Sequence, residues 1–95
     1  MKFRPAVLLK KLPNDYEDWL VCMIKTKLHQ EIEGLDININ EDDLDYKDSG
    51  LKQKSLVRVS RLAVVNKSQL PGILGSISIQ RLQNIKANLI RWINN

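Results

Sequence analysis

The spacing of apolar residues changes along this chain and divides it into two kinds of structure. Up to residue 70 the apolar residues gather in short runs, of which the longest is the six residues Trp19–Ile24, a length typical of strands. After the chain breakers Pro71-Gly72 and Gly75 they recur every three or four residues, as on one face of a helix. The pattern predicts a small, mainly β structure followed by one C-terminal helix.

Two apolar runs near the start of the chain predict a β-hairpin. Residues 4–9 begin with an Arg-Pro pair, and proline is tolerated at the first position of a strand. Residues 19–24 have the length of a buried strand, and the turn signal Pro13-Asn14-Asp15 lies between the two runs. Cys22, inside the second run, is expected to be a small buried side chain.

The middle of the chain predicts shorter elements. Residues 26–33 are compatible with one turn of helix that ends at Gly34, and residues 36–39 alternate polar and apolar side chains as a half-buried strand does. Residues 40–50 are acidic and contain few aliphatic side chains, which predicts a loop. Residues 55–65 have strand propensity throughout and predict one bent strand or two consecutive strands.

The C-terminal segment has the clearest periodicity. Ser78 is the expected N-cap, because its hydroxyl can accept a hydrogen bond from a free backbone N–H of the first turn. Arg91 lies near the negative end of the helix dipole, and Arg81 and Lys86 are expected on the solvated side. The apolar face consists of Ile79, Leu82, Ile85, Leu89, Ile90 and Ile93.

Charge is segregated along the chain. Residues 31–50 carry eight acidic side chains against one lysine, whereas residues 51–95 carry eight basic side chains and no acidic one. Residues 1–30 are also basic, and the formal net charge is +4. The basic parts therefore predict a polyanionic partner. For the acidic part we expect a mobile loop near the binding groove, which masks that surface or receives a partner.

Length and cysteine count exclude several classes of protein. The chain has 95 residues, which we expect to form one domain, residues 1–95, and which leave no room for a large catalytic fold. Its single cysteine excludes an intrachain disulfide and a CxxC metal site. The longest apolar run is far shorter than a membrane span, and the N-terminus has no signal-peptide core, so we expect a cytoplasmic protein.

The chemistry available to this chain is polar and cationic. It contains no phosphate-loop or serine-hydrolase motif, and the acidic run lacks the glycine and the closing glutamate of a calcium loop, so we expect neither a metal nor a cofactor. His29 is the only histidine, which excludes paired-histidine catalysis within one chain. Arginine and lysine in this number suit phosphate, although the plainer interpretation of most of them, and of His29, is an ordinary solvated surface.

Metal-free cleavage of RNA is one reaction that such residues can support. It needs a proton acceptor near the 2′-hydroxyl, a cation that neutralises the developing negative charge on phosphorus, and a proton donor to the leaving 5′-oxygen. Trp19 and Trp92 are flanked by aliphatic residues, and we interpret them as core or interface anchors. With few aromatic residues, the chain shows no surface of interleaved aromatics for stacking bases.

Five stretches of the chain occur in an informative order. They are Arg4–Leu9, Trp19–Ile32, Asp45 with Ser49–Lys52, Ser55–Arg58 followed by Arg61–Val65, and Leu74–Ser78 leading into the final helix. In this order they resemble the MazF/PemK toxins of type II toxin–antitoxin modules over nearly the whole chain. The resemblance implies an SH3-like small barrel with a C-terminal helix, a homodimer, and metal-independent, sequence-selective cleavage of single-stranded RNA such as mRNA. It also implies an acidic antitoxin protein that blocks the RNA groove.

The resemblance also implies roles for individual residues. The arginine of the Arg-Pro motif stabilises the phosphate in this family and corresponds to Arg4. A Thr or Ser that follows the second apolar run contributes to catalysis. It aligns with Lys25 or Thr26, and we choose Thr26 as the only hydroxyl there, against the alternative that it merely bonds its own backbone at a strand end. The residues expected to bind RNA are Lys25, Lys27, His29, Lys52 and Arg58.

The start of the chain departs from the family pattern. Family members usually begin with a strand that carries a Gly-Asp pair, and a loop after it helps to build the active site. Only three residues precede Arg4 here, so we expect the barrel to lack its first strand and assign no general acid or base. Two alternatives to RNA cleavage stay open. One is an inactive barrel that only binds antitoxin or nucleic acid, and the other is a gyrase-directed toxin of the same fold.

Overall fold

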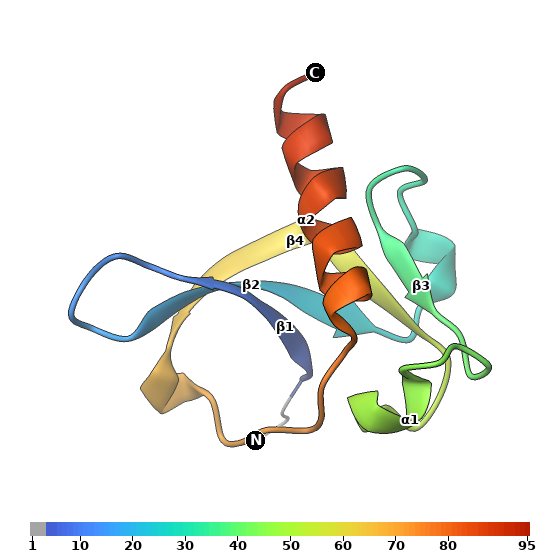
Figure 1. The fold of residues 1–95 in the computed structure, drawn as a ribbon, viewed down its shortest axis with the longest axis horizontal. Coiled ribbons are helices and arrows are strands. Elements are labelled where there is room, and N and C mark those ends of the chain that lie inside the picture. Colours follow the sequence, from blue (N-terminus) through green and yellow to red (C-terminus); the bar gives the residue numbers. More distant parts are fainter. Residues whose placement is uncertain (1–3) are drawn as a thin grey trace.

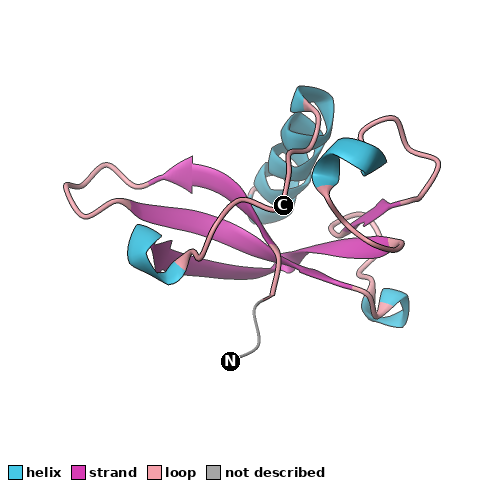
Figure 2. Ribbon diagram, turned by 90° about the horizontal axis from the view of Figure 1, so that it is seen from below, coloured by secondary structure: helices cyan, strands magenta, loops and turns pink. Residues whose placement is uncertain are grey.

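The computed structural model describes residues 4–95 and is mainly β, as the sequence predicts. Four strands form one curled antiparallel sheet in the order β1-β2-β4-β3, and the C-terminal helix α2 (Ile79–Ile93) lies on one face of it (Figures 1 and 2). The strands are β1 (Ala6–Lys11), β2 (Asp18–Lys25), β3 (Ile37–Ile39) and β4 (Ser55–Asn66). Three single turns of helix connect them, namely η1 (Leu28–Gln30), α1 (Tyr46–Ser49) and η2 (Lys67–Gln69).

β1 and β2 form the predicted hairpin, in which Val7 pairs with Cys22. The turn is held by its own polar groups, because Asn14 Oδ1 accepts a hydrogen bond from Tyr16 N at 3.0 Å. β1 begins at Ala6 rather than at residue 4, since proline has no N–H for the ladder. The carbonyl of Pro5 still accepts a hydrogen bond from Ile24 N at 3.0 Å, which holds the Arg-Pro pair beside the end of β2.

β4 is one long, bent strand rather than two. It pairs with β2 along two stretches, and the register shifts between Cys22, which faces Leu62, and Met23, which faces Arg58. Such a shift bends a strand and increases its twist. The first part of β4 consequently has β2 on one side and β3 on the other, and every side chain from Ser55 to Val59 is buried.

The core lies between the curled sheet and α2. Cys22 is fully buried in it, as predicted, and Ile85 is the only fully buried residue of α2. The predicted apolar face of the helix is buried only in part, because the second half of α2 projects beyond the sheet (Figure 1) and leaves Ile90 and Ile93 exposed. Ile79, in the first turn, is exposed as well. Trp92 is also exposed, whereas Trp19 is half-buried on β2. No helix within residues 4–95 is long and apolar enough to cross a membrane.

Ser78 caps α2 as predicted, since its Oγ accepts a hydrogen bond from Arg81 N at 3.1 Å. The expected position of Arg81 on the solvated side is wrong. Its side chain is only 13% exposed and turns toward the acidic segment, where it binds Asp43 and Asp45 and donates from Nη1 to Asn38 O at 3.0 Å. The periodicity of the helix records apolar residues only, so it carries no sign of a carboxylate packed against the first turn.

The acidic segment 40–50 is more ordered than the predicted loop. It contains the short helix α1, which ends where Gly50 adopts a left-handed conformation with φ of 74°. Asp43 Oδ2 accepts a hydrogen bond from Asn40 N at 2.8 Å and also binds Arg81. Two of the carboxylates expected to mask a binding groove are therefore bound to the first turn of α2. Farther back along the chain, the helical turn predicted within residues 26–33 is η1.

Candidate functional site

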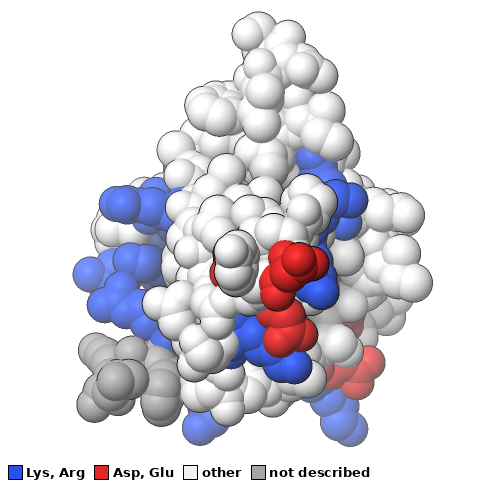
Figure 3. Space-filling model, turned by 90° about the vertical axis from the view of Figure 1, so that its left-hand side faces the viewer, with Lys and Arg blue, Asp and Glu red and all other residues white. Residues whose placement is uncertain are grey.

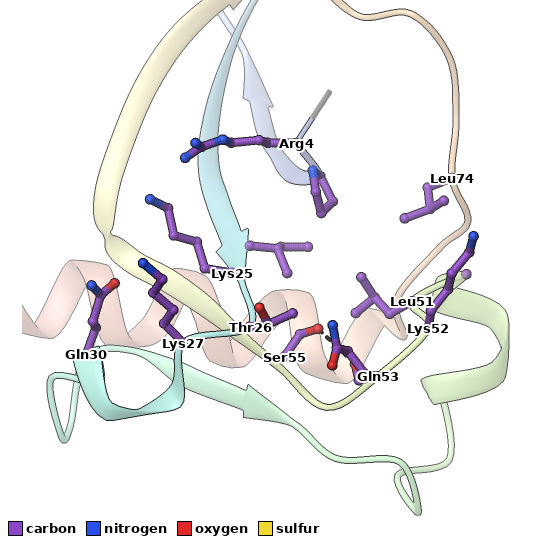
Figure 4. Close-up of a pocket in the computed structure, with 13 residues that line it drawn as sticks. Arg4, Lys25, Thr26, Lys27, Gln30, Leu51, Lys52, Gln53, Ser55 and Leu74 are labelled. Carbon is purple, nitrogen blue, oxygen red and sulfur yellow. Dashed lines mark hydrogen bonds between the residues drawn. The ribbon is translucent and has the colours of Figure 1, made fainter. Parts of the chain in front are cut away.

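A groove of about 600 Å³ opens where the end of β2, the start of β4 and the segment after α1 meet (Figure 4). We call it the cationic groove, because four of its lining side chains are basic and none is acidic. It is lined by Arg4, Pro5, Ile24, Lys25, Thr26, Lys27, Gln30, Gly50, Leu51, Lys52, Gln53, Ser55 and Leu74. A smaller cavity of about 200 Å³ lies between α1 and the start of α2 and includes Asp45 and Asp48 in its lining.

The lining residues occupy distinct sides of the cationic groove. Arg4, Lys25, Lys27 and Gln30 follow one another along one side, and Leu51, Lys52 and Leu74 stand opposite (Figure 4). Thr26, Ser55 and Gln53 lie between these sides. The arrangement follows from the backbone, because Pro5 is bound to Ile24 and the chain turns from β2 into η1 immediately after. Figure 3, which views the molecule from the side of the β1–β2 turn, shows basic side chains gathered along the left of this face and acidic ones near its middle, while the projecting end of α2 at the top is largely uncharged.

Like charges crowd the cationic groove. The pKa of Lys25 is lowered from its ordinary value, first by repulsion from Arg4 and further by slight desolvation and by Arg61, Arg58 and Lys27. A lowered lysine pKa means that the protonated form is disfavoured where it stands. A bound anion would relieve this repulsion, so the site has an electrostatic preference for phosphate or carboxylate ligands.

The chain around Leu74 forms one wall of the cationic groove, and two glycines allow it to pack closely against the α1 segment. A Cβ on Gly50 would overlap the Leu74 carbonyl, and a Cβ on Gly75 would overlap the carbonyls of Asp48 and Ser49. The contact is fixed by a hydrogen bond of 2.8 Å from Ser76 N to Asp48 O. Sequence reasoning treats Gly75 only as a chain breaker, but the residue is needed for this close approach.

The structure brings together five of the seven residues singled out from the sequence: Arg4, Lys25, Thr26, Lys27 and Lys52. It does not bring His29 to the groove lining, although that side chain is exposed on η1. Arg58 is not part of the lining either, because it is buried behind the groove. Gln30, Gln53 and Ser55 were missed. Gln30 and Ser55 lie within stretches that resemble the family, but a neutral polar side chain carries no signal of a binding role in a single sequence.

Arg58 is part of a buried polar cluster at the back of the groove. Its Nη1 donates to Gln30 Oε1 at 3.0 Å, and its Nε lies 3.7 Å from Asp36 Oδ2. The side chain of Asp36 is fully buried and accepts hydrogen bonds from Ile32 N at 2.9 Å and from Ser60 N at 3.0 Å. The contact with Asp36 is an ion pair without a hydrogen bond, because the buried Arg58 Nε has no hydrogen-bond partner among the described residues. The hydrogen bond to Gln30 makes Arg58 a support for the groove wall.

Metal ligands do not converge in the part of the chain that the structure describes, residues 4–95. No group of three or more His, Cys, Asp and Glu side chains there could hold a metal ion. What the cationic groove offers chemically is a set of hydrogen-bond donors and positive charges around two hydroxyls, those of Thr26 and Ser55. Such a set can bind a phosphodiester and stabilise negative charge that develops on it.

Comparison with known families agrees with this geometry. Residues 1–93 match the sequence profile of a family described as PemK-like, MazF-like toxin of type II toxin-antitoxin system. The match covers nearly the whole chain, including the four strands that the structure describes, the lining of the cationic groove and the whole of α2. A comparison with curated proteins finds no match.

Proposed function

Because the chain belongs to the PemK-like, MazF-like toxins of type II toxin–antitoxin systems, we propose that it is a metal-independent, sequence-selective endoribonuclease acting on single-stranded RNA. The observation that supports this proposal is the cationic groove, which gathers Arg4 and Thr26 with three lysines and no acidic lining residue. An acidic lining would repel a phosphodiester, whereas this one attracts it. The proposal places the protein in the cytoplasm, where mRNA is found.

The proposed reaction is attack of a ribose 2′-oxygen on the neighbouring phosphorus. A new P–O bond forms as the 2′-hydroxyl loses its proton, the bond to the 5′-oxygen breaks as that oxygen takes up a proton, and the products are a 2′,3′-cyclic phosphate and a free 5′-hydroxyl. Arg4 would donate to the phosphate oxygens, because a guanidinium presents parallel N–H groups and stays charged through the reaction. Thr26 would orient the reacting phosphate through its hydroxyl, and Lys25, Lys27 and Lys52 would bind the phosphates on either side.

The proposal includes two protein partners. An acidic antitoxin would compete with RNA for the cationic groove, because both ligands are polyanions. A second copy of the chain would form a homodimer of domains that each span residues 1–95. The exposed apolar side chains Ile90, Trp92 and Ile93 of α2, 58%, 60% and 62% exposed, support a protein interface at this end of the helix.

A second candidate function is binding without catalysis. Within the described residues the groove lining contains no histidine and no carboxylate, so it lacks a side chain whose ordinary pKa suits a proton acceptor at neutral pH. This observation favours a barrel that binds antitoxin or nucleic acid and leaves it intact. A gyrase-directed toxin of the same fold is a separate alternative and would inhibit gyrase without cleaving RNA.

Cleavage of a single-stranded RNA in the presence of EDTA tests the proposal. We expect the purified protein to cleave at preferred sequences, and Arg4→Ala to reduce the rate by about 100-fold or more, the scale of removing one charge-stabilising donor. Thr26→Val should also lose activity while Thr26→Ser keeps most of it, which separates a role for the hydroxyl from a role in local backbone structure. Lys10→Ala is the matched control, since Lys10 is exposed on β1 and does not line the groove.

One outcome would decide against the endoribonuclease, and another against the role of Arg4. RNA that is bound tightly, in a salt-dependent way, and recovered intact would favour the binding module. Cleavage at the same sites and rate by Arg4→Ala would remove that residue from the proposed mechanism.

A further inference from the structure

Gln30 stands out on the cationic side of the groove, because it is a neutral amide in line with Arg4, Lys25 and Lys27 (Figure 4). A glutamine amide can present either a donor or an acceptor to a ligand, depending on which way it is turned. Here the orientation of the amide is set by its contact with Arg58. Arg58 Nη1 donates to Gln30 Oε1 at 3.0 Å, and a guanidinium has donors only, so the oxygen must be the atom that faces it.

The buried cluster fixes this orientation. Arg58 Nε lies 3.7 Å from the fully buried carboxylate of Asp36 without a hydrogen bond, and Nη2 donates to Ser60 Oγ at 3.4 Å. Turning the Gln30 amide over would set its NH₂ group against the guanidinium, and two donors facing each other in this partly buried place lose the hydrogen bond between them. The amide atom of Gln30 that Arg58 leaves free is consequently Nε2, a hydrogen-bond donor.

This donor has no acceptor of its own. Among residues 4–95 the structure gives Gln30 Nε2 no hydrogen-bond partner, while the residue lines the cationic groove. Its neighbours on that side carry positive charges and suit phosphates, which contribute affinity but carry no sequence information. A neutral donor of fixed polarity adds something different, because it distinguishes a carbonyl from an amino group on a base edge.

We propose that Gln30 is a specificity residue that donates from Nε2 to a base carbonyl of the bound RNA, favouring uracil or guanine over cytosine or adenine at one position. The inference rests on the proposed function. Uracil and guanine present a carbonyl oxygen where cytosine and adenine present an amino group. Single-stranded RNA exposes these edges to protein side chains. Gln30 contacts the substrate, and Arg58 is the positioning residue that sets its polarity.

The test compares the affinities of the protein for two RNA octamers that differ only in the edges of their bases. Its readout is the ratio of the two affinities. Fully 2′-O-methylated U8 and C8 resist attack by a 2′-hydroxyl, so their binding can be followed by fluorescence anisotropy without cleavage. We expect the wild-type protein to bind U8 roughly fivefold more tightly than C8, the scale of one hydrogen bond. Gln30→Ala should bring the ratio close to one, and Gln30→Glu, which presents an acceptor, should favour C8.

Gln53→Ala is the matched control, because Gln53 is a glutamine that lines the same groove but is not held by Arg58. It should keep the wild-type ratio. A ratio is independent of the fraction of protein that is folded, so partial unfolding of a variant does not obscure the result. A wild-type ratio near one, or a Gln30→Ala variant that keeps the wild-type ratio, would overturn the inference.

Unmodified RNA separates this inference from the proposed function. If the protein discriminates U8 from C8 through Gln30 but leaves unmodified RNA intact, the inference stands and the endoribonuclease falls. If it cleaves RNA while Gln30→Ala keeps its selectivity between U8 and C8, the endoribonuclease stands and the inference falls. A protein that binds neither octamer would overturn the inference, and cleavage of unmodified RNA alone would then decide on the endoribonuclease.

Discussion

Arg81 and Asp45 form a bidentate ion pair that connects the first turn of α2 to the acidic segment. Arg81 Nε and Nη2 each lie 2.8 Å from one of the two Asp45 carboxylate oxygens, and the two side chains are only 13% and 10% exposed. Asp45 Oδ2 also accepts a hydrogen bond from Ser78 N at 3.0 Å, next to the helix cap. One carboxylate therefore positions both the start of α2 and the segment that leads to the cationic groove.

Replacing Asp45 should be costly. Asp45→Asn leaves the Arg81 guanidinium largely buried without its main counter-charge, and we expect a loss of about 3 kcal/mol in the free energy of unfolding. Urea unfolding followed by tryptophan fluorescence measures it. Asp42→Asn is the control, because Asp42 is exposed in the same segment and should change stability by less than about 0.5 kcal/mol. Equal losses in the two variants would contradict the importance of the pair.

The same pair predicts how stability depends on pH. Its hydrogen bonds with Arg81 hold the pKa of Asp45 well below its usual range, and Asp43 is shifted in the same direction, first by Asn40 N and then by Arg81. In the unfolded chain the Asp45 and Asp43 carboxylates become protonated near pH 4, and in the folded protein only at lower pH. Between these two pH values the unfolded state therefore binds more protons than the folded state. The stabilisation is present above about pH 4 and is lost as the pH falls toward the folded pKa. Urea unfolding between pH 2 and 7 should show a shallower acid loss in Asp45→Asn than in the wild type.

Local signals predicted the hairpin and the cap of α2, because the residues that decide them are neighbours in the chain. The long-range polar contacts were not predictable in this way. Arg81 meets Asp45 across 36 positions and Arg58 meets Gln30 across 28, and no periodicity or spacing in one sequence links such partners.

The candidate site likewise contains residues that local motifs predict and a residue that they place wrongly. Arg4 and Thr26 were found through motifs, and both line the cationic groove. His29 is among the residues expected to bind RNA, but it lies on the turn η1 and the structure does not bring it to the lining. Distance along the chain is a poor guide at the point where a strand ends and the backbone turns.

The Leu74 wall of the groove should be sensitive to a single methyl group. Gly75→Ala would push a Cβ into the carbonyls of Asp48 and Ser49, and we expect it to destabilise the fold by about 1–3 kcal/mol and to weaken RNA binding. Gly72→Ala is a matched control three residues away, since a Cβ there meets nothing within 4 Å. Thermal unfolding of both variants checks this, and a Gly75→Ala protein as stable as Gly72→Ala would show that the contact can relax.

Cys22 should be chemically inert in the folded protein. It is fully buried, and desolvation, with a smaller contribution from Asp36, raises the pKa of its thiol to about 12. The reactive thiolate is therefore almost absent at neutral pH. A disulfide reagent such as dithionitrobenzoate should react with the native protein only as fast as it unfolds, and promptly in urea. Fast reaction without urea would place Cys22 outside the core.

Arg4 should control the protonation of Lys25. Arg4 is the largest cause of the lowered pKa of Lys25, so removing its charge makes the protonated ammonium less unfavourable. Arg4→Met should consequently raise the pKa of Lys25, as measured by an NMR titration of the lysine side-chain carbons. Lys10→Met removes a positive charge that is not among the causes and should leave the value unchanged. An unchanged Lys25 pKa in Arg4→Met would mean that the two cations do not interact in solution, and that the repulsion invoked for the cationic groove is absent.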